Sequence, residues 1–310
     1  MTEDISKQVA VLVPCYNEEA TVEQVVKDFK NALPGAVIHV FDNNSSDRTS
    51  DVARKAGAVV HFVSAPGKGS VVRRMFADVE ADIYLMVDGD ATYDASSAQK
   101  LIDKLVAEGL DMVVGCRQED STENDNYRLG HRLGNKLLTG TVQAIFGGKF
   151  TDMLSGYRAF SYRYAKSFPA QAKGFDTETE LTVHALELRM PYGEINTPYS
   201  ERPEGSESKL STYKDGFRIL KMIIKLYASE RPLAFYGLIG ALLLTIGISL
   251  IIPIIITFVQ IHEVPKFPTV ILVSALSISS LLSFSVGLVL NTVTIGRREI
   301  KHLIYLLAKA

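Results

Sequence analysis

The sequence predicts an α/β protein with a doubly wound, mixed or mostly parallel sheet, followed by an amphipathic helix and two membrane-crossing helices. Three observations lead to this expectation. Before residue 210, short apolar runs alternate with stretches of helical periodicity, as in a sheet with helices on both faces. Polar residues follow the ends of these apolar runs. Beyond residue 232, two long segments contain no charged residue.

Length and composition narrow the function classes. The 310 residues suffice for one large domain or two ordinary ones. A formal net charge of −2 and a pI near 6.3 give no support for nucleic-acid binding. The two cysteines, Cys15 and Cys116, are too few for a disulfide framework or a metal framework. The N-terminus has no apolar signal core, so we expect the first domain not to be exported.

The elements follow from the apolar pattern in chain order. Continuous apolar runs bounded by turn residues predict buried strands at 9–13, 37–41, 59–63, 83–87 and 112–115. Apolar residues at helical spacing, such as Val22, Val25, Val26 and Phe29, predict the helices between them. These helices are expected at 21–33 and 49–56, after Gly69 through residue 79, and at 97–108, with later ones at 128–146 and 179–188.

The strand at 83–87 leads directly into two carboxylates, Asp88 and Asp90, which are separated by a single glycine. Ligands bind beyond the carboxyl ends of strands in open α/β sheets. Two carboxylates there can hold Mg²⁺ or Mn²⁺, an ion that usually shares its coordination with substrate phosphates. A solvated Asp-Gly turn is the alternative interpretation.

Polar residues from several strand ends should converge on one cleft, because these ends share one edge of a doubly wound sheet. They are Tyr16, Asn17, Glu18, Asp42, Asp47, Lys68, Asp88 and Asp90. Carboxylate and amide groups can hold a base and a ribose, and a lysine with a divalent ion can offset a diphosphate. A P-loop is excluded because the earlier glycine is missing before Gly67-Lys-Gly-Ser, and no G-x-G-x-x-G follows the first strand.

The order of the motifs carries a family resemblance. Pro14-Cys-Tyr-Asn-Glu-Glu, Asp42-Asn-Asn-Ser-Ser-Asp-Arg-Thr, Gly67-Lys-Gly and Asp88-Gly-Asp together resemble the family 2 glycosyltransferases with the GT-A fold. Asp152-Met-Leu-Ser-Gly-Tyr-Arg158 and Glu178-Thr-Glu180 narrow the resemblance to the polyprenyl-phosphate branch. That branch includes dolichyl-phosphate mannose and glucose synthases and bactoprenol glucosyltransferases. The resemblance covers roughly residues 8 to 212.

The resemblance implies inverting, metal-dependent transfer of one sugar from a nucleotide-sugar to polyprenyl phosphate, in cell-envelope glycan biosynthesis. UDP-glucose is the first expectation, with GDP-mannose and UDP-N-acetylhexosamines behind it. Base and ribose would contact Pro14, Tyr16, Asn17, Glu18, Asp42 and Asp47. Lys68 and an ion at Asp88 and Asp90 would offset the charge of the leaving diphosphate.

The acceptor phosphate is expected at Arg117, Arg132 and Asn135, which the resemblance assigns to the lipid phosphate. Arginine suits this task because its two-pronged fork matches a phosphate. A solvated basic helix face is the alternative for the stripe that includes Arg132. Lys209, in a polar connector, is a further phosphate candidate.

Four acidic or basic residues of the later motifs complete the expected site. Asp152 would lie beside the reacting centre, where it either orients a group or accepts a proton late, because a phosphate monoester is already anionic near pH 7. Arg158, Glu178 and Glu180 are weaker candidates. For the two glutamates, a favourable position at a helix N-terminus is the alternative.

The second half predicts attachment to a bilayer. We expect a catalytic domain at 1–210, an interfacial amphipathic helix at 211–232, spans at 233–260 and 267–296, and a basic tail at 297–310. A helix packed on the soluble domain is the alternative at 211–232. Basic residues on both outer flanks predict a multi-pass inner-membrane protein with a cytoplasmic catalytic domain. The resemblance adds a tetramer as an expectation.

Three rival functions remain from the sequence: transfer to another lipid or to a glycan, nucleotidyl transfer, and a non-catalytic membrane scaffold that binds sugar nucleotides. Processive polysaccharide synthases are excluded, since they carry a Gln-x-x-Arg-Trp motif and this chain contains no tryptophan.

Overall fold

The computed structural model describes residues 7–119, 139–169, 177–200, 221, 224–264 and 266–308. The chain divides into two compact units. The first comprises residues 1–217 and 300–310, and the second comprises residues 218–299. Each unit is described separately below.

The first unit is built on a seven-stranded sheet with the order β3-β2-β1-β4-β6-β5-β7. The strands are β1 (Val9–Cys15), β2 (Val37–Asp42), β3 (Val59–Phe62), β4 (Ile83–Met86), β5 (Met112–Glu119), β6 (Arg158–Ser161) and β7 (Tyr192–Tyr199). Strands β1 to β4 pair in parallel, as do β5 and β7, whereas β6 is antiparallel to both of its neighbours. The predicted mixed, mostly parallel sheet is therefore confirmed, although β6 and β7 had not been predicted.

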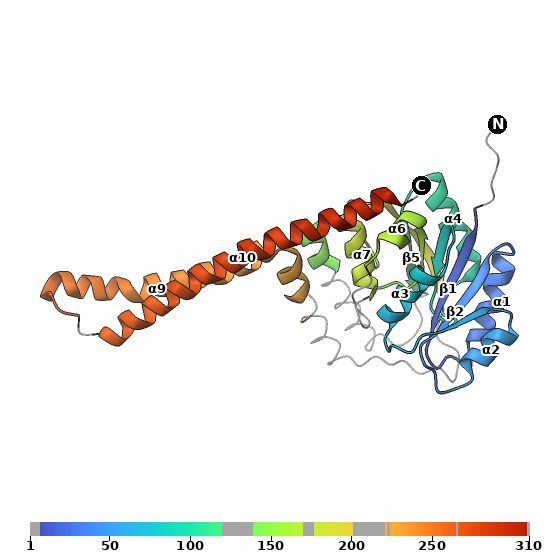
Figure 1. Ribbon diagram of the computed structural model, residues 1–310, viewed down its shortest axis with the longest axis horizontal. Coiled ribbons are helices and arrows are strands. Elements are labelled where there is room, and N and C mark those ends of the chain that lie inside the picture. The colour runs from blue at the N-terminus through green and yellow to red at the C-terminus, as the bar shows by residue number, and fades with distance from the viewer. Residues whose placement is uncertain are drawn as a thin grey trace. The chain divides into compact units, whose positions relative to one another are not determined.

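Helices cover both faces of this sheet (Figure 1). They are α1 (Val22–Ala32), α2 (Thr49–Lys55), α3 (Lys68–Asp78), α4 (Ala98–Ala107), α6 (Tyr162–Ser167) and α7 (Thr177–Glu187). On one face, Phe29 of α1 and Leu101 of α4 join a core with Val11 and Leu85 of the central strands. On the other, the Phe76 ring of α3 packs edge-on against Tyr84 and Phe160 of the sheet, with centroid distances of 5.8 and 5.5 Å.

The last turns of α10 (Phe267–Leu307) belong to the first unit. Two polar pairs join them to the rest of that unit. Lys301 Nζ lies 2.6 Å from Oε2 of Glu187, whose side chain is only 1% exposed. Tyr305 donates a hydrogen bond of 2.7 Å to Asp111 Oδ2. These contacts attach the end of α10 to the end of α7 and the start of β5.

The second unit is a hairpin of α9 (Pro232–Ile261) and the preceding part of α10 (Figure 1). Small residues let the two helices approach closely. Ser280 Oγ donates to Gly240 O at 2.8 Å, and a Cβ at position 240 would meet the Phe284 ring at 2.9 Å. Gly240 and Gly247 of α9, and Ser280, Gly287 and Thr294 of α10, are buried, so the contact repeats every seven residues along each helix.

Both helices of the hairpin are long and apolar enough to cross a membrane, which takes about 20 residues. Their most apolar windows are only 11% and 17% buried, unlike the core helix of a soluble protein. The second helix continues to Leu307, beyond the span expected to end at 296. Of the expected interfacial helix, residues 221 and 224–232 are described, and residues 224–230 are helical.

Candidate active site

The loops that follow β1 and β2 are joined to one another at the carboxyl edge of the sheet. Cys15, the last residue of β1, pairs with Asp42, the last residue of β2. Asn17, which has a positive φ of 54°, accepts a hydrogen bond of 2.8 Å from the Ser46 amide through its side chain. The Glu18 amide donates to Thr49 Oγ1 at 2.9 Å. The structure thus brings together the expected nucleotide loops, with the Tyr16 side chain 48% exposed.

The two aspartates of the second loop are already engaged by neighbouring groups. Asp42 is 4% exposed and accepts hydrogen bonds from the Ser45 amide at 2.9 Å and from the Ser50 hydroxyl. Asp47 accepts from the amides of Thr49 and Glu19. Partial burial raises the pKa of Asp47, but the hydrogen bonds from Thr49 and Glu19 outweigh it and lower the pKa overall. Asp47 therefore fastens the β1 and β2 loops to each other.

Asn43 was not singled out from the sequence, yet it organises this edge of the sheet. Its amide nitrogen donates to Val63 O at 3.0 Å and Ala65 O at 2.7 Å, beyond the end of β3. Its amide oxygen accepts from the Gly67 amide at 2.7 Å. Asn43 thus fixes the approach to Lys68, the first residue of α3. Its place directly after Asp42 in the motif was the only available signal.

Lys68 and the two carboxylates after β4 lie at the same edge. Lys68 Nζ is 2.5 Å from Asp88 Oδ1 and also 2.5 Å from Glu178 Oε1 of α7. Burial lowers the pKa of Lys68, but Asp88 and Glu178 more than reverse this and raise it overall. Asp90 is 6% exposed, and its Oδ1 accepts from Thr92 Oγ1 at 2.7 Å.

Two glycines allow this packing. A Cβ at position 89, between the two aspartates, would lie 2.5 Å from the Cys15 sulfur. A Cβ at position 156 would lie 2.3 Å from Asp88 Oδ2. Gly156 precedes β6 by two residues, so the segment that contains Asp152 passes directly beside Asp88.

The donor set at this edge suits a hard divalent cation. Among the described residues, no group of three or more His, Cys, Asp or Glu side chains is arranged to hold a metal. Asp88 and Asp90, which follow β4, are two carboxylates of the kind that Mg²⁺ or Mn²⁺ can share with phosphate oxygens and water.

Arg117, an expected acceptor-phosphate residue, forms a two-pronged ion pair with Asp152. Its Nε lies 2.7 Å from Oδ2, and its Nη2 lies 2.8 Å from Oδ1. The guanidinium carbon is also 5.5 Å from the centre of the Tyr199 ring, within cation–π range. The expected partners Arg132, Asn135 and Lys209 lie outside the described residues.

Arg158 is fully buried, and its recorded hydrogen bonds are to the interior of the protein. It donates to the carbonyls of Ser155 at 2.8 Å and Met153 at 2.5 Å, and to Thr182 Oγ1 at 2.9 Å. These contacts hold the segment beside Asp88 against α7. Glu178 is 6% exposed and contacts Lys68, whereas Glu180 is half-buried on the same helix.

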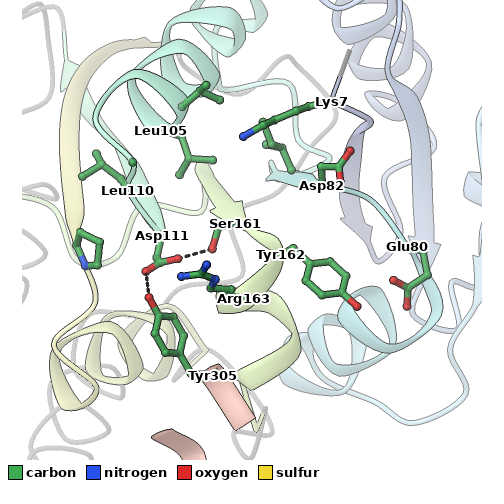
Figure 2. Close-up of a pocket in the computed structure, with 14 residues that line it drawn as sticks. Lys7, Glu80, Asp82, Leu105, Leu110, Asp111, Ser161, Tyr162, Arg163 and Tyr305 are labelled. Carbon is green, nitrogen blue, oxygen red and sulfur yellow. Dashed lines mark hydrogen bonds between the residues drawn. The ribbon is translucent and has the colours of Figure 1, made fainter. Parts of the chain in front are cut away.

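A cavity of about 610 Å³ lies at the opposite edge of the sheet (Figure 2). Its lining includes Ile83, the first residue of β4, and Asp111, which immediately precedes β5. Figure 2 shows Asp111 hydrogen-bonded to Ser161 and Tyr305 on its wall. Because Asp88 and Asp90 follow the other end of β4, this cavity is separate from the candidate active site.

Comparison with known proteins agrees with this geometry. A family model described as glycosyl transferase family 2 matches residues 10–168. Glycosyltransferase AglJ of Haloferax volcanii is 35% identical over 78% of this chain and 79% of its own length. A dolichyl-phosphate hexose transferase of the same organism is 29% identical over 74% of this chain and 99% of its own.

A solved structure shares the fold. Glucosyl-3-phosphoglycerate synthase from Mycobacterium tuberculosis, in complex with Mn²⁺, UDP-glucose and phosphoglyceric acid, superposes with a TM-score of 0.59 and is 22% identical. The match covers 72% of this chain and 79% of that one. The expected GT-A fold is confirmed, and the names of the relatives agree with the polyprenyl-phosphate branch. The chain belongs to glycosyl transferase family 2 and is a glycosyltransferase.

Proposed function

We propose that this glycosyltransferase transfers a single sugar, with inversion, from a nucleotide-sugar to a polyprenyl phosphate at the cytoplasmic face of the inner membrane. UDP-glucose is the first expected donor, and undecaprenyl phosphate is the expected acceptor. The observation that carries the proposal is that Lys68, Asp88 and Gly156 are in contact at one sheet edge. The groups proposed to bind the donor are thereby adjacent to the segment 152–156, whose first residue, Asp152, pairs with Arg117.

The donor diphosphate would bind at the start of α3. Lys68 there adds a positive charge to backbone N–H groups at a helix N-terminus, an arrangement that favours phosphate. A divalent ion held by Asp88 and Asp90 would act as a Lewis acid that neutralises the departing diphosphate. The engaged carboxylates of Asp42 and Asp47 would keep the β1 and β2 loops in shape around the base and ribose.

The acceptor phosphate would bind at Arg117, whose guanidinium fork can hold two phosphate oxygens. A phosphate monoester carries between one and two negative charges at neutral pH, so it can attack the sugar without a strong base. The two-pronged pair with Arg117 gives Asp152 an orienting role in this scheme.

A membrane acceptor is supported by features of the second unit and by relatives. Two helices are long and apolar enough to cross a bilayer. Arg231, Arg297 and Arg298 flank them, which favours the cytoplasmic side for both flanks. One relative is named for a dolichyl-phosphate acceptor.

The test is sugar transfer by the full-length protein in purified membranes, using a panel of labelled nucleotide-sugars with undecaprenyl phosphate. Asp90→Ala should abolish transfer, and chelation of divalent ions should do the same reversibly. Asp103→Asn is the matched control, because Asp103 pairs with Gln99 on the exposed face of α4. If Asp90→Ala keeps activity within a few-fold of the unaltered protein, the metal assignment is wrong.

A further inference from the structure

Lys68 is shared between two carboxylates that come from different parts of the fold. Its ammonium is 2.5 Å from Asp88, after β4, and 2.5 Å from Glu178, in the first turn of α7. The side chains of Lys68, Asp88 and Glu178 are 18%, 27% and 7% exposed. The three charges therefore interact in a largely water-excluded place.

The position of Lys68 in α3 is not explained by helix stability. It is the first residue of the helix, where the helix dipole disfavours a cation. The α3 N-cap has no side-chain hydrogen bond, and the first turn contains no acidic residue. The two carboxylates from outside the helix offset this unfavourable placement and keep the ammonium charged.

Asp88 cannot serve Lys68 and a divalent ion equally. A divalent ion that coordinates Asp88, through either carboxylate oxygen, competes with the ammonium for the negative charge of this carboxylate and so weakens its pairing with Lys68. If Lys68 then had no other anionic partner, a mostly buried cation would be left unpaired, which is strongly unfavourable. Glu178 is already in contact with Lys68 and can remain its partner throughout.

We propose that Glu178 is a positioning residue that keeps Lys68 paired when the divalent ion takes Asp88. When the ion binds Asp88, Lys68 exchanges Asp88 for the donor diphosphate as its second partner and keeps Glu178 as its first. The inference rests on the proposed metal-dependent function and gives Glu178 a task beyond its favourable place in the first turn of α7. No proton changes hands in this exchange.

The test measures Mn²⁺ affinity without nucleotide, from the electron paramagnetic resonance signal of free Mn²⁺ in titrations of the full-length protein in detergent. Glu178→Gln should weaken Mn²⁺ binding about tenfold, because the ion must then leave Lys68 unpaired. Lys68→Met should instead strengthen Mn²⁺ binding, because it removes the competing cation. Asp103→Asn, on the exposed face of α4, should leave the affinity unchanged.

The double variant Lys68→Met/Glu178→Gln separates an action through Lys68 from a direct one. If Glu178 acts through Lys68, Glu178→Gln should cost much less Mn²⁺ affinity in the Lys68→Met background. An equal loss in both backgrounds, or no loss in either, overturns the inference while leaving the metal site intact. If Asp90→Ala does not weaken Mn²⁺ binding, both the inference and the proposed metal site are wrong.

Discussion

Both side-chain oxygens of Asp152 contact the guanidinium of Arg117, at 2.7 and 2.8 Å. The Arg117 amide adds a third, longer hydrogen bond to Oδ2 at 3.3 Å. Asp152 is 7% exposed, so these contacts take up most of what its carboxylate can accept. Of the two roles considered from the sequence, this favours orienting Arg117 over accepting a proton.

Asp152→Asn should therefore affect acceptor binding more than the chemical step. The amide can accept only one of the two side-chain hydrogen bonds, so Arg117 would lose its fixed direction. We expect the KM for polyprenyl phosphate to rise about tenfold, the scale of one charge-assisted hydrogen bond, with a small change in kcat. The measurement is initial-rate kinetics over a range of acceptor concentrations at saturating donor.

The contrasting outcome for Asp152 is informative about the acceptor. A neutral hydroxyl acceptor needs a general base, and loss of such a base lowers kcat by about 10²–10⁴-fold. A collapse of kcat with unchanged acceptor KM would show that Asp152 is a base and that the acceptor is not a phosphate.

Gly156→Ala should disable the donor site without unfolding the protein. The new Cβ would lie 2.3 Å from Asp88 Oδ2, so Asp88 must move. Displacement of a catalytic group by about 1 Å can cost about a hundredfold in rate, which is the loss we expect in sugar transfer. Gly35→Ala is the matched control, since nothing lies within 4 Å of a Cβ there. If Gly156→Ala transfers sugar at the wild-type rate, the position of Asp88 is not important for catalysis.

The sequence predicted the sheet where strands are marked by continuous apolar runs. Strands β1 to β5 were expected for this reason, with boundaries within a few residues. Strand β6, which lies between β4 and β5, begins with Arg158, a residue type that rarely lies in a buried strand. Its burial is tolerated because Thr182 and two carbonyls accept hydrogen bonds from its guanidinium. Strand β7 contains Pro198 and several polar residues, so its pairing with β5 depends on tertiary context.

The sequence predicted which residues of the candidate site follow strand ends, but it did not predict which side chains pair with one another. Asp42, Lys68 and Asp88 were expected to converge because parallel strands share one edge. No periodicity connects Arg117 with Asp152, which are 35 positions apart, or Lys68 with Glu178. These pairs arise from the path of the chain around β6 and α7, which local patterns do not encode.

Arg158→Met should destabilise the first unit. The guanidinium donates to Ser155 O, Met153 O and Thr182 Oγ1, and all of these contacts are buried. A buried acceptor without a partner costs about 1–3 kcal/mol, so we expect a loss of about 3 kcal/mol or more and a clearly lower Tm by circular dichroism. An unchanged Tm with impaired transfer would instead place Arg158 in the active site, as the family resemblance implies.

The stability of the first unit should fall as the pH drops below about 6.5, in part through His184, whose ring is 1% exposed. The Ser167 hydroxyl uses its hydrogen to donate to Tyr164 O, so it can only accept from His184, whose Nε2–H donates to it at 3.0 Å. The other ring nitrogen of His184, Nδ1, has no hydrogen-bond partner among the described residues. Burial, followed by the nearby charge of Lys301, lowers the pKa of His184 to about 3. The unfolded chain binds this proton near pH 6.5 and the folded protein does not, so this contribution is present above pH 6.5 and is lost as the pH falls toward 3.

His184→Gln should therefore flatten the dependence of Tm on pH between 8 and 5. Each pH unit well below 6.5 costs up to about 1.4 kcal/mol for one such histidine. Burial, with a smaller effect of His61, also lowers the pKa of His39, to about 4, so the variant should retain part of the slope. His262→Asn is the control, because His262 is exposed and its φ of 58° suits asparagine. If His184→Gln and His262→Asn show the same slope as the unaltered protein, His184 is not the group that senses pH.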